Sequence, residues 1–295
     1  KRMLGRTPGH ISVIRPLVNG VISDFDVTQE LLRQFLKRLN QGNTFSSIRR
    51  AVLAVPEGLT EVERKSVEDA AITAGAVKVY LASSPLTAAL GAGLPVESPV
   101  GSLIVDIGGG TTDIAVISFG GIVISKTLKV AGDRFNDDIV RCMRDEFHLA
   151  IGESTAESAK MTVGSAIPLD ERLDTPVRGR DFSTGLPKEI IVKNSHIRTA
   201  ISKSLRSIID AIREVIEMTP PELVGDMLKQ GISLSGGGAL LRGLDELIQK
   251  ETGVSTRIVD EPLAAVVRGL QRIIDDFEGN RQFLESPLKP FEISL

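Results

Sequence analysis

Two short segments combine glycines with hydroxyl or acidic residues, the residue types that bind phosphate groups. The first spans residues 105–113 and reads VDIGGGTTD between two apolar stretches. Its glycines allow positive φ and let backbone N–H groups reach phosphate oxygens, forming an anion-binding nest that larger side chains would block. Asp106 can hold a magnesium ion, directly or through water, and Thr111 or Thr112 can donate a hydrogen bond to a terminal phosphate. A tight hairpin that merely requires glycine explains an isolated triple glycine equally well.

The second segment spans residues 233–241 and reads SLSGGGALL. The pattern predicts a strand that ends at Gly236, Gly237 and Gly238 and opens a helix. Helix starts attract anions through free N–H groups and the helix dipole. Two such turns in one chain therefore favour a single ligand, held in a cleft between two lobes, over two unrelated hairpins.

Apolar periodicity indicates which elements position these turns. A β-meander surrounds the first turn, and the order strand, helix, strand, helix before it is typical of a mostly parallel sheet covered by helices. Thr28 is a candidate cap for the first helix, and Thr60 with Glu63 forms a capping box at the second. The predicted strands are 51–55, 77–81, 102–106, 114–118, 122–130, short strands within 177–192, and 232–235; the predicted helices are 27–39, 60–74, 86–91, 136–147, 156–161, 197–216 and 239–250.

Length and composition narrow the class of protein. A chain of 295 residues suits two domains. A net charge of -3 without long charge blocks, 4% aromatic residues and no Trp argue against a nucleic-acid partner. Cys142 is the lone cysteine and no apolar run reaches the roughly 20 residues that span a bilayer, so we expect a cytoplasmic protein. Lys1 begins the chain in mid-element, so we also expect a segment upstream of it.

Motifs over nearly the whole chain resemble those of the bacterial actin family MreB, the rod-shape-determining proteins of the actin, sugar-kinase and heat-shock-chaperone superfamily. The motifs are Gly5 to Pro8, Ile14 to Pro16, Gly20 to Ile22, Asp106 to Thr112, Ala131 to Asp133, Ala150 to Glu153, Ser183 to Pro187, Thr219 to Leu223 and Gly236 to Leu244. The resemblance implies an α/β, two-lobed, actin-like ATPase fold, in which each lobe is a mixed sheet flanked by helices with a smaller subdomain inserted.

The resemblance also implies domain boundaries. The first lobe would have its core at residues 47–98, completed by 263–295, with an incomplete small subdomain at 1–46. The second lobe would have its core at 99–138, completed by 217–262, with a small subdomain and a connecting helix at 139–216.

By the same resemblance, the cofactors are ATP and Mg2+. Asp106 would lie near the magnesium ion, and Thr111 would face the attacking water. Glu157 and Lys160 match the family's pair that grips the ribose and adenine, although such a pair is by itself usually a solvated helix pair. The full set of expected nucleotide contacts is Gly108, Gly109, Gly110, Thr111, Thr112, Glu157, Ser158, Ala159, Lys160, Gly236, Gly237, Gly238, Ala239 and Leu240.

The chain departs from the family pattern at two places. The family usually has a glutamate just before the proline at Pro85, where it orients the hydrolytic water, but this chain has Ser83 and Ser84, and neither can act as a carboxylate base. General-base assistance is typically worth about a hundredfold or more, so we expect slow hydrolysis or hydrolysis achieved differently, with Ser84 positioning water. The family's first phosphate loop also has no counterpart here, which agrees with a missing upstream segment.

The resemblance implies a cytoskeletal ATPase whose subunits stack into filaments that determine rod cell shape and direct cell-wall synthesis. Its partners would be other copies of the chain, the inner face of the cell membrane, reached through the loop at Phe45, and membrane-bound elongation and wall-synthesis proteins. Two alternatives remain. A sugar kinase or phosphatase would need an aspartate base that no segment clearly supplies, and a chaperone-type switch would continue into a β-rich peptide-binding domain.

Overall fold

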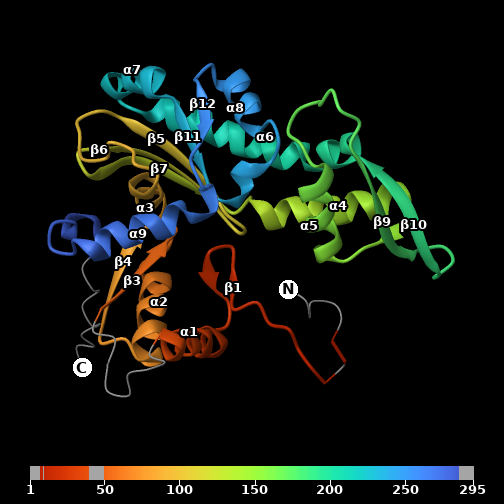
Figure 1. Ribbon diagram of the computed structural model, residues 1–295, viewed down its shortest axis with the longest axis horizontal. Coiled ribbons are helices and arrows are strands. Elements are labelled where there is room, and N and C mark those ends of the chain that lie inside the picture. The colour runs from red at the N-terminus through yellow and green to blue at the C-terminus, as the bar shows by residue number, and fades with distance from the viewer. Residues whose placement is uncertain (1–6, 9, 40–49, 286–295) are drawn as a thin grey trace.

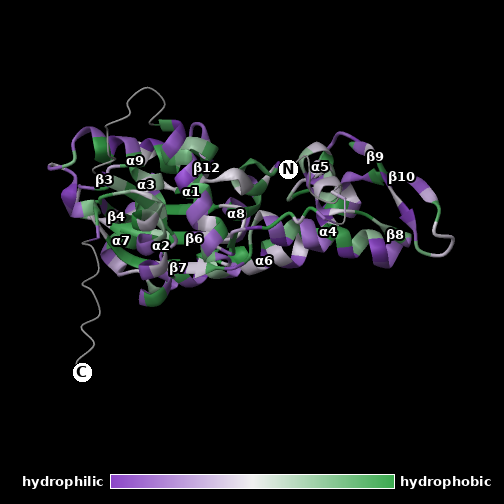
Figure 2. Cartoon of the chain, turned by 90° about the horizontal axis from the view of Figure 1, so that it is seen from below, coloured by the Kyte–Doolittle hydropathy of each residue, from purple (hydrophilic) through white to green (hydrophobic). Residues whose placement is uncertain are grey.

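The computed structural model describes residues 7–8, 10–39 and 50–285. Figure 1 shows three groups of elements: one around a large sheet at the upper left, one around β3 and β4 at the lower left, and an arm that extends to the right. Figure 2, seen from below, shows hydrophobic residues concentrated along the strands and mixed with hydrophilic ones on the covering helices. None of the described helices is both long enough and apolar enough to span a bilayer.

The large sheet is mixed and has the strand order β12-β11-β5-β6-β7. Its strands are β5 (Ser102–Ile107), β6 (Thr112–Ser118), β7 (Gly121–Leu128), β11 (Ile232–Ser235) and β12 (Thr256–Ile258). β5, β6 and β7 form the predicted antiparallel meander, whereas β11 pairs in parallel with both β5 and β12. The sheet therefore brings together two segments that lie more than 100 residues apart in the sequence.

Both faces of this sheet are covered, as the continuous apolar runs require. Leu103 and Val105 point to the face covered by α6 (Asn194–Met218), whose residues Ile201 and Ile208 are fully buried there. Ile104 points to the opposite face, which is covered by α3 (Ser84–Gly91) and α9 (Ala265–Asp275). Alternate side chains of β5 therefore pack into two separate hydrophobic cores, one on each face of the sheet.

α3 and α9 cross at very short range. A Cβ atom on Gly91 would overlap the Ala265 carbonyl oxygen, and one on Gly269 would overlap the Thr87 carbonyl oxygen. Each helix therefore carries a glycine at the point where the other backbone passes. The close crossing attaches α9, late in the chain, to the elements that precede β5.

The lower group contains the parallel strands β3 (Arg50–Val55) and β4 (Lys78–Ser83) with the helices α1 (Phe25–Leu39) and α2 (Glu61–Ala74). The predicted capping box is confirmed, because the Thr60 hydroxyl accepts from the Glu63 amide and the Glu63 carboxylate accepts from the Thr60 amide. The prediction for Thr28 is wrong. Helix α1 begins earlier, and Asp24 accepts from the amide of Val27, while Thr28 is buried within the helix.

The arm comprises α4 (Gly132–Phe147), α5 (Glu153–Val163) and a sheet of order β10-β9-β8. Its strands are β8 (Leu149–Ala150), β9 (Asp174–Asp181) and β10 (Pro187–Lys193). The predicted strands within 177–192 are confirmed as β9 and β10, which pair as an antiparallel hairpin. α4 begins four residues before the predicted start at residue 136, so its first turn directly follows Ala131. The long amphipathic helix α6 connects the arm to the large sheet, as Figure 1 shows.

The remaining elements are short. β1 (Leu17–Val18) and β2 (Val21–Ile22) form a hairpin whose turn residues Asn19 and Gly20 both have positive φ. The other described elements are α7 (Pro221–Gln230), α8 (Leu244–Thr252) and the 3-10 turns η1 (Gly237–Leu240), η2 (Pro262–Ala264) and η3 (Arg281–Phe283).

The predicted helix over residues 239–250 is wrong in its start. A 3-10 turn follows Gly236, and the α-helix begins only at Leu244. Gly243 has φ of 69° and therefore interrupts the helical conformation between the 3-10 turn and α8. A Cβ at this position would also overlap the Ile167 side chain. Glycine is required at this position for both reasons.

Candidate functional site

The two glycine turns adjoin at one edge of the large sheet. β5 and β11 run in parallel, Ser235 is in register with Asp106, and each strand leads directly into its glycines. A Cβ on Gly236 would overlap the Ile107 carbonyl and lie 2.8 Å from Asp106 Oδ1. Gly236 also has φ of 80°, so glycine is required for conformation as well as for contact. The two turns therefore touch one another, within one sheet.

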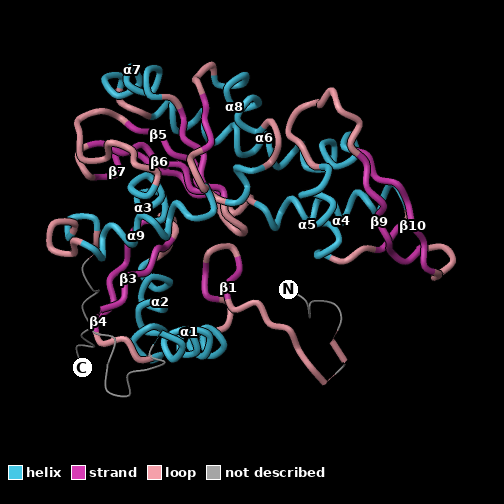
Figure 3. Tube along the Cα trace, in the orientation of Figure 1, coloured by secondary structure: helices cyan, strands magenta, loops and turns pink. Residues whose placement is uncertain are grey.

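The first turn faces the β1–β2 hairpin. A Cβ on Gly110 would lie 2.8 Å from the Asn19 Cα, and one on Gly20 would lie 3.0 Å from Thr111 Cγ2. Figure 3 shows this hairpin beneath the strand ends of the large sheet. Gly108, Gly109 and Gly110 all lack positive φ, so our expectation about their conformation is wrong, and close approach of the hairpin is what requires glycine at Gly110.

Backbone amides remain available at this turn. Gly108 donates to the Thr111 carbonyl, while the carbonyls of Gly108 and Gly109 accept from Gly132 and Asp133 at the start of α4. Within the part of the chain that the structure describes, the amides of Gly109 and Gly110 have no hydrogen-bond acceptor. A Cβ added at Gly109 would make only ordinary van der Waals contact, with the Asp133 carboxylate at 3.8 Å. Two adjacent unengaged amides are the arrangement that binds an anion.

Two carboxylates face each other across β5 and β6, where Asp106 pairs with Asp113. Asp113 accepts from the hydroxyls of Thr127 at 2.5 Å and Thr111 at 3.1 Å, and from the Glu57 amide at 3.4 Å. Asp106 is only 9% exposed, and its Oδ1 has no hydrogen-bond partner. Burial is the main cause that raises the pKa of Asp106 to about 6, with the Ser235 hydroxyl lowering it and the Asp113 charge raising it further. Burial also raises the pKa of Asp113, against the effect of its three donors.

The expected phosphate contacts differ in their availability. Thr111 lies at the end of the turn and donates to Asp113. Thr112 is fully buried, and its hydroxyl donates to the Val130 carbonyl at 2.7 Å, so the structure does not present it to the turn. Ala239 is fully buried in the core, whereas Leu240 is 53% exposed.

The expected ribose and adenine contacts lie on α5. Lys160 extends to the first glycine turn, where its Nζ donates to the Gly132 carbonyl at 2.8 Å. Gly132 in turn lies beside Gly109, because a Cβ on Gly132 would be 3.7 Å from the Gly109 Cα. Glu157 is one helical turn away on the same helix. Ser158 is exposed, whereas Ala159 is buried and packs in the core.

The serines that replace the family's glutamate lie where β4 leads into α3. Ser83 ends β4 and is buried, with an Oγ that has no hydrogen-bond partner. Ser84 begins α3, the helix that covers β5 and β6. No carboxylate is supplied by either residue.

Sequence reasoning missed a cluster at the start of α4 and α5. Arg15 forms ion pairs with Asp133, at 3.5 Å, and with Glu153. Burial raises the pKa of Asp133, while Arg15 and Lys160 lower it. The motifs at 14–16, 131–133 and 150–153 contained all three residues, but nothing in their spacing indicated that they meet.

The described elements form an actin-like fold. A 23% identical structure described as a MamK double helical filament shares this fold with a TM-score of 0.74, over 88% of this chain and 80% of that one. The crystal structure of MreB5 of Spiroplasma citri bound to ADP superposes with a TM-score of 0.90 at 39% identity, covering 95% of this chain and 84% of that one.

Sequence comparison identifies the family. The family model described as MreB/Mbl protein matches residues 1–282. The cell shape-determining protein MreB of Escherichia coli K12 is 42% identical over 97% of this chain and 83% of its own length. The cell shape-determining protein Mbl of Bacillus subtilis 168 is 42% identical over 94% of this chain and 83% of its own length. The chain belongs to the MreB/Mbl family.

Proposed function

We propose that this chain binds ATP with Mg2+ at the two glycine turns and polymerises into actin-like filaments that determine rod cell shape. The observation that carries the proposal is the contact between the turns beside two unengaged amides and the unpartnered Asp106 Oδ1. The structures of MreB5 bound to ADP and to AMPPNP support an adenine nucleotide as the ligand. The names of the E. coli and B. subtilis relatives support the role in cell shape.

The residues fit a nucleotide and its metal ion. The amides of Gly109 and Gly110 would bind phosphate oxygens, and Gly236 to Leu240 would lie against the other side of the nucleotide. The described residues contain no cluster of three potential metal ligands, so Asp106 would hold Mg2+ together with phosphate oxygens and water, as is usual for this ion. Bound Mg2+ would neutralise phosphate charge. Glu157 and Lys160 would bind the ribose and adenine.

Hydrolysis is proposed to be slow. Thr111 is held by its hydrogen bond to Asp113, in a position to orient water near the turn. Ser84 supplies a hydroxyl and no carboxylate, so proton removal from that water would lack the family's usual base.

The domain boundaries expected from the sequence are retained as a proposal. Pairing of β11 with β5 supports joining 217–262 to the second lobe core at 99–138. The crossing of α3 and α9 supports joining 263–295 to the first lobe core at 47–98. The subdomains at 1–46 and 139–216 would complete the two lobes, with the nucleotide near their junction.

Filaments would form by head-to-tail stacking, a heterologous contact that propagates because it does not close. We further propose that they lie on the cytoplasmic face of the membrane, through the Phe45 loop, and contact the elongation and wall-synthesis proteins there. Phe45 lies outside the described residues.

Sedimentation of full-length protein with and without MgATP tests the proposed function. Polymer that pellets in the presence of MgATP is expected. A protein that stays in the supernatant at all concentrations, or that phosphorylates or dephosphorylates sugars, would favour the sugar-kinase alternative. Nucleotide-dependent binding of unfolded peptide would favour the chaperone alternative.

A further inference from the structure

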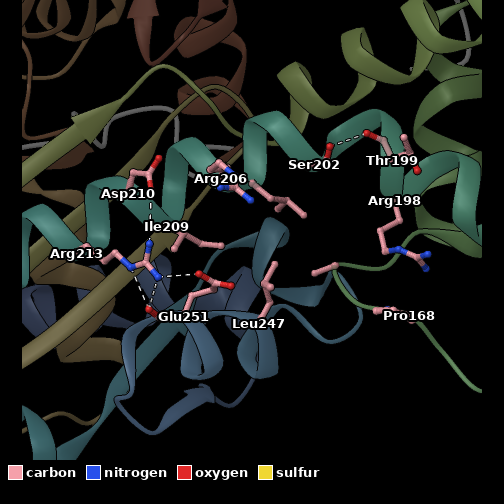
Figure 4. A pocket seen from close by; sticks show the side chains of 12 residues that line it. Pro168, Arg198, Thr199, Ser202, Arg206, Ile209, Asp210, Arg213, Leu247 and Glu251 are labelled. Atoms are coloured by element: carbon pink, nitrogen blue, oxygen red, sulfur yellow. Dashed lines mark hydrogen bonds and ion pairs between the residues drawn. The ribbon is translucent and has the colours of Figure 1, made fainter.

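A groove lies along α6, between this helix, α8 and the loop that contains Pro168 (Figure 4). Its volume of about 330 Å³ is at the lower end of the range found for ligand sites. Its apolar floor includes the buried residues Leu205 and Ile209 and the half-buried Leu247. No residue of either glycine turn lines it, so the groove is separate from the proposed nucleotide site.

Three arginines of α6 line this groove at intervals of eight and seven residues, Arg198, Arg206 and Arg213. Arg213 is neutralised by Asp210, at 3.8 Å, and by Glu251, at 2.7 Å. Among the described residues, no carboxylate lies within ion-pair distance of Arg198 or Arg206, and Arg198 donates to the neutral side chain of Asn194. Arg198 at one end of the groove and Arg206 midway along it are thus positive charges without a carboxylate partner among the described residues.

We propose that the groove binds an acidic segment of a partner protein. Two carboxylates of the segment would pair with Arg198 and Arg206, and an apolar side chain between them would pack on Leu205, Ile209 and Leu247. Such an arrangement combines an apolar centre with a charged rim, as protein interfaces do. The proposal goes beyond the nucleotide-dependent function and does not depend on it.

The spacing of the arginines suits a peptide with two acidic residues. Eight residues of α-helix rise about 12 Å, which separates the Cα atoms of Arg198 and Arg206 along α6. An extended peptide covers that distance in about four residues. Two acidic residues about four positions apart in an extended segment, or about eight apart in a helix, would therefore match Arg198 and Arg206.

The other end of the groove disfavours a continuous polyanion. Asp210 and Glu251 line it beside Arg213, so a nucleic-acid backbone or an anionic lipid surface laid along α6 would meet carboxylates there. The groove also lacks aromatic side chains on which bases could stack. An acidic peptide whose two carboxylates meet Arg198 and Arg206, and which ends before Arg213, avoids most of this repulsion.

Selection of a random dodecapeptide library on the full-length protein, with and without MgATP, tests the proposal. Enriched peptides are expected to carry two acidic residues about four positions apart, with leucine or a similar residue between them. Synthetic copies should bind the Arg198→Glu/Arg206→Glu variant at least about tenfold more weakly, because two attractions become repulsions, and added salt should weaken binding to the wild type.

Two control variants accompany this measurement. Lys203→Glu makes the same kind of charge reversal on α6 but outside the groove, and it should leave peptide affinity unchanged. Arg198→Lys/Arg206→Lys keeps both charges and should retain most of the binding. Circular dichroism melting of every variant separates loss of binding from loss of folding, which matters most at Arg198 because it is half-buried and donates to Asn194.

Three results would overturn the proposal. One is that the selection enriches peptides without acidic residues, or enriches no peptide that binds in the groove. Another is equal peptide affinity in the wild type and the Arg198→Glu/Arg206→Glu variant. The third is loss of polymer pelleting, or of pelleting with phosphatidylglycerol vesicles, in that variant without loss of peptide binding. The groove would then be a contact between copies of the chain or a lipid site.

Discussion

The buried carboxylate of Asp106 should make the ligand-free protein less stable at neutral pH than a variant that cannot ionise there. Its pKa is raised from 3.8 to about 6 in the folded protein, chiefly by burial. At 1.36 kcal/mol per unit, this shift corresponds to about 3 kcal/mol. Because the folded state binds the proton more tightly than the unfolded state does, this residue lowers the free energy of unfolding as pH rises from about 4 to 6.

Asp106→Asn removes this titration while keeping the size of the side chain. Relative to wild type, the variant should gain about 3 kcal/mol of unfolding free energy between pH 4 and pH 7, and the gain should level off above pH 7. Urea unfolding of both proteins without nucleotide, at several pH values, measures the difference directly. Other groups titrate alike in both proteins and cancel. A difference that stays constant with pH, or that falls as pH rises, would refute the assignment of Asp106 as a destabilised carboxylate.

Three further changes test other parts of the site and fold. Ser84→Glu should raise the rate of phosphate release by full-length protein by about tenfold to a hundredfold, because it restores a carboxylate base. The control Ser66→Glu on α2 should leave the rate unchanged. Equal rates in Ser84→Glu and wild type would remove the argument for a missing base. Gly269→Ala should lower the free energy of unfolding in urea by about 3 kcal/mol, because the added methyl group overlaps the Thr87 carbonyl. The control Gly225→Ala adds its methyl group in open space and should have a smaller effect. Similar urea midpoints for the two variants would contradict the close crossing of α3 and α9. Phe45→Ser should reduce pelleting with anionic liposomes, and unchanged pelleting would count against membrane contact through this loop.

Local patterns predicted most individual elements. The apolar stretches around both glycine turns became β5, β6 and β11, and the capping box at Thr60 formed as expected. Local signals failed where a neighbouring residue competes. Asp24 caps α1 in place of Thr28, and Gly243 delays the helix expected at Ala239.

Contacts between distant segments were not visible in the sequence. The residues of the two turns were identified, but their direct contact depends on the parallel pairing of β5 with β11, which no local pattern encodes. The β1–β2 hairpin over Gly110 and the ion pairs of Arg15 with α4 and α5 arise in the same way. The loose contact between Gly109 and Asp133 also follows from packing, and it provides a position at which a larger side chain is expected to block ligand binding while the fold is retained.

The most direct test of the central claim is the affinity of full-length protein for MgATP when Gly109 is replaced by valine. The three atoms nearest to an added Cβ all belong to the Asp133 side chain, and the nearest is 3.8 Å away, so the unfolding free energy should change by about 1 kcal/mol or less. Isothermal titration calorimetry should then show at least a hundredfold weaker binding in Gly109→Val, and unchanged binding in the control Gly225→Val on α7. A Gly109→Val protein that is folded and binds MgATP as tightly as wild type would show that the nucleotide does not lie at this turn.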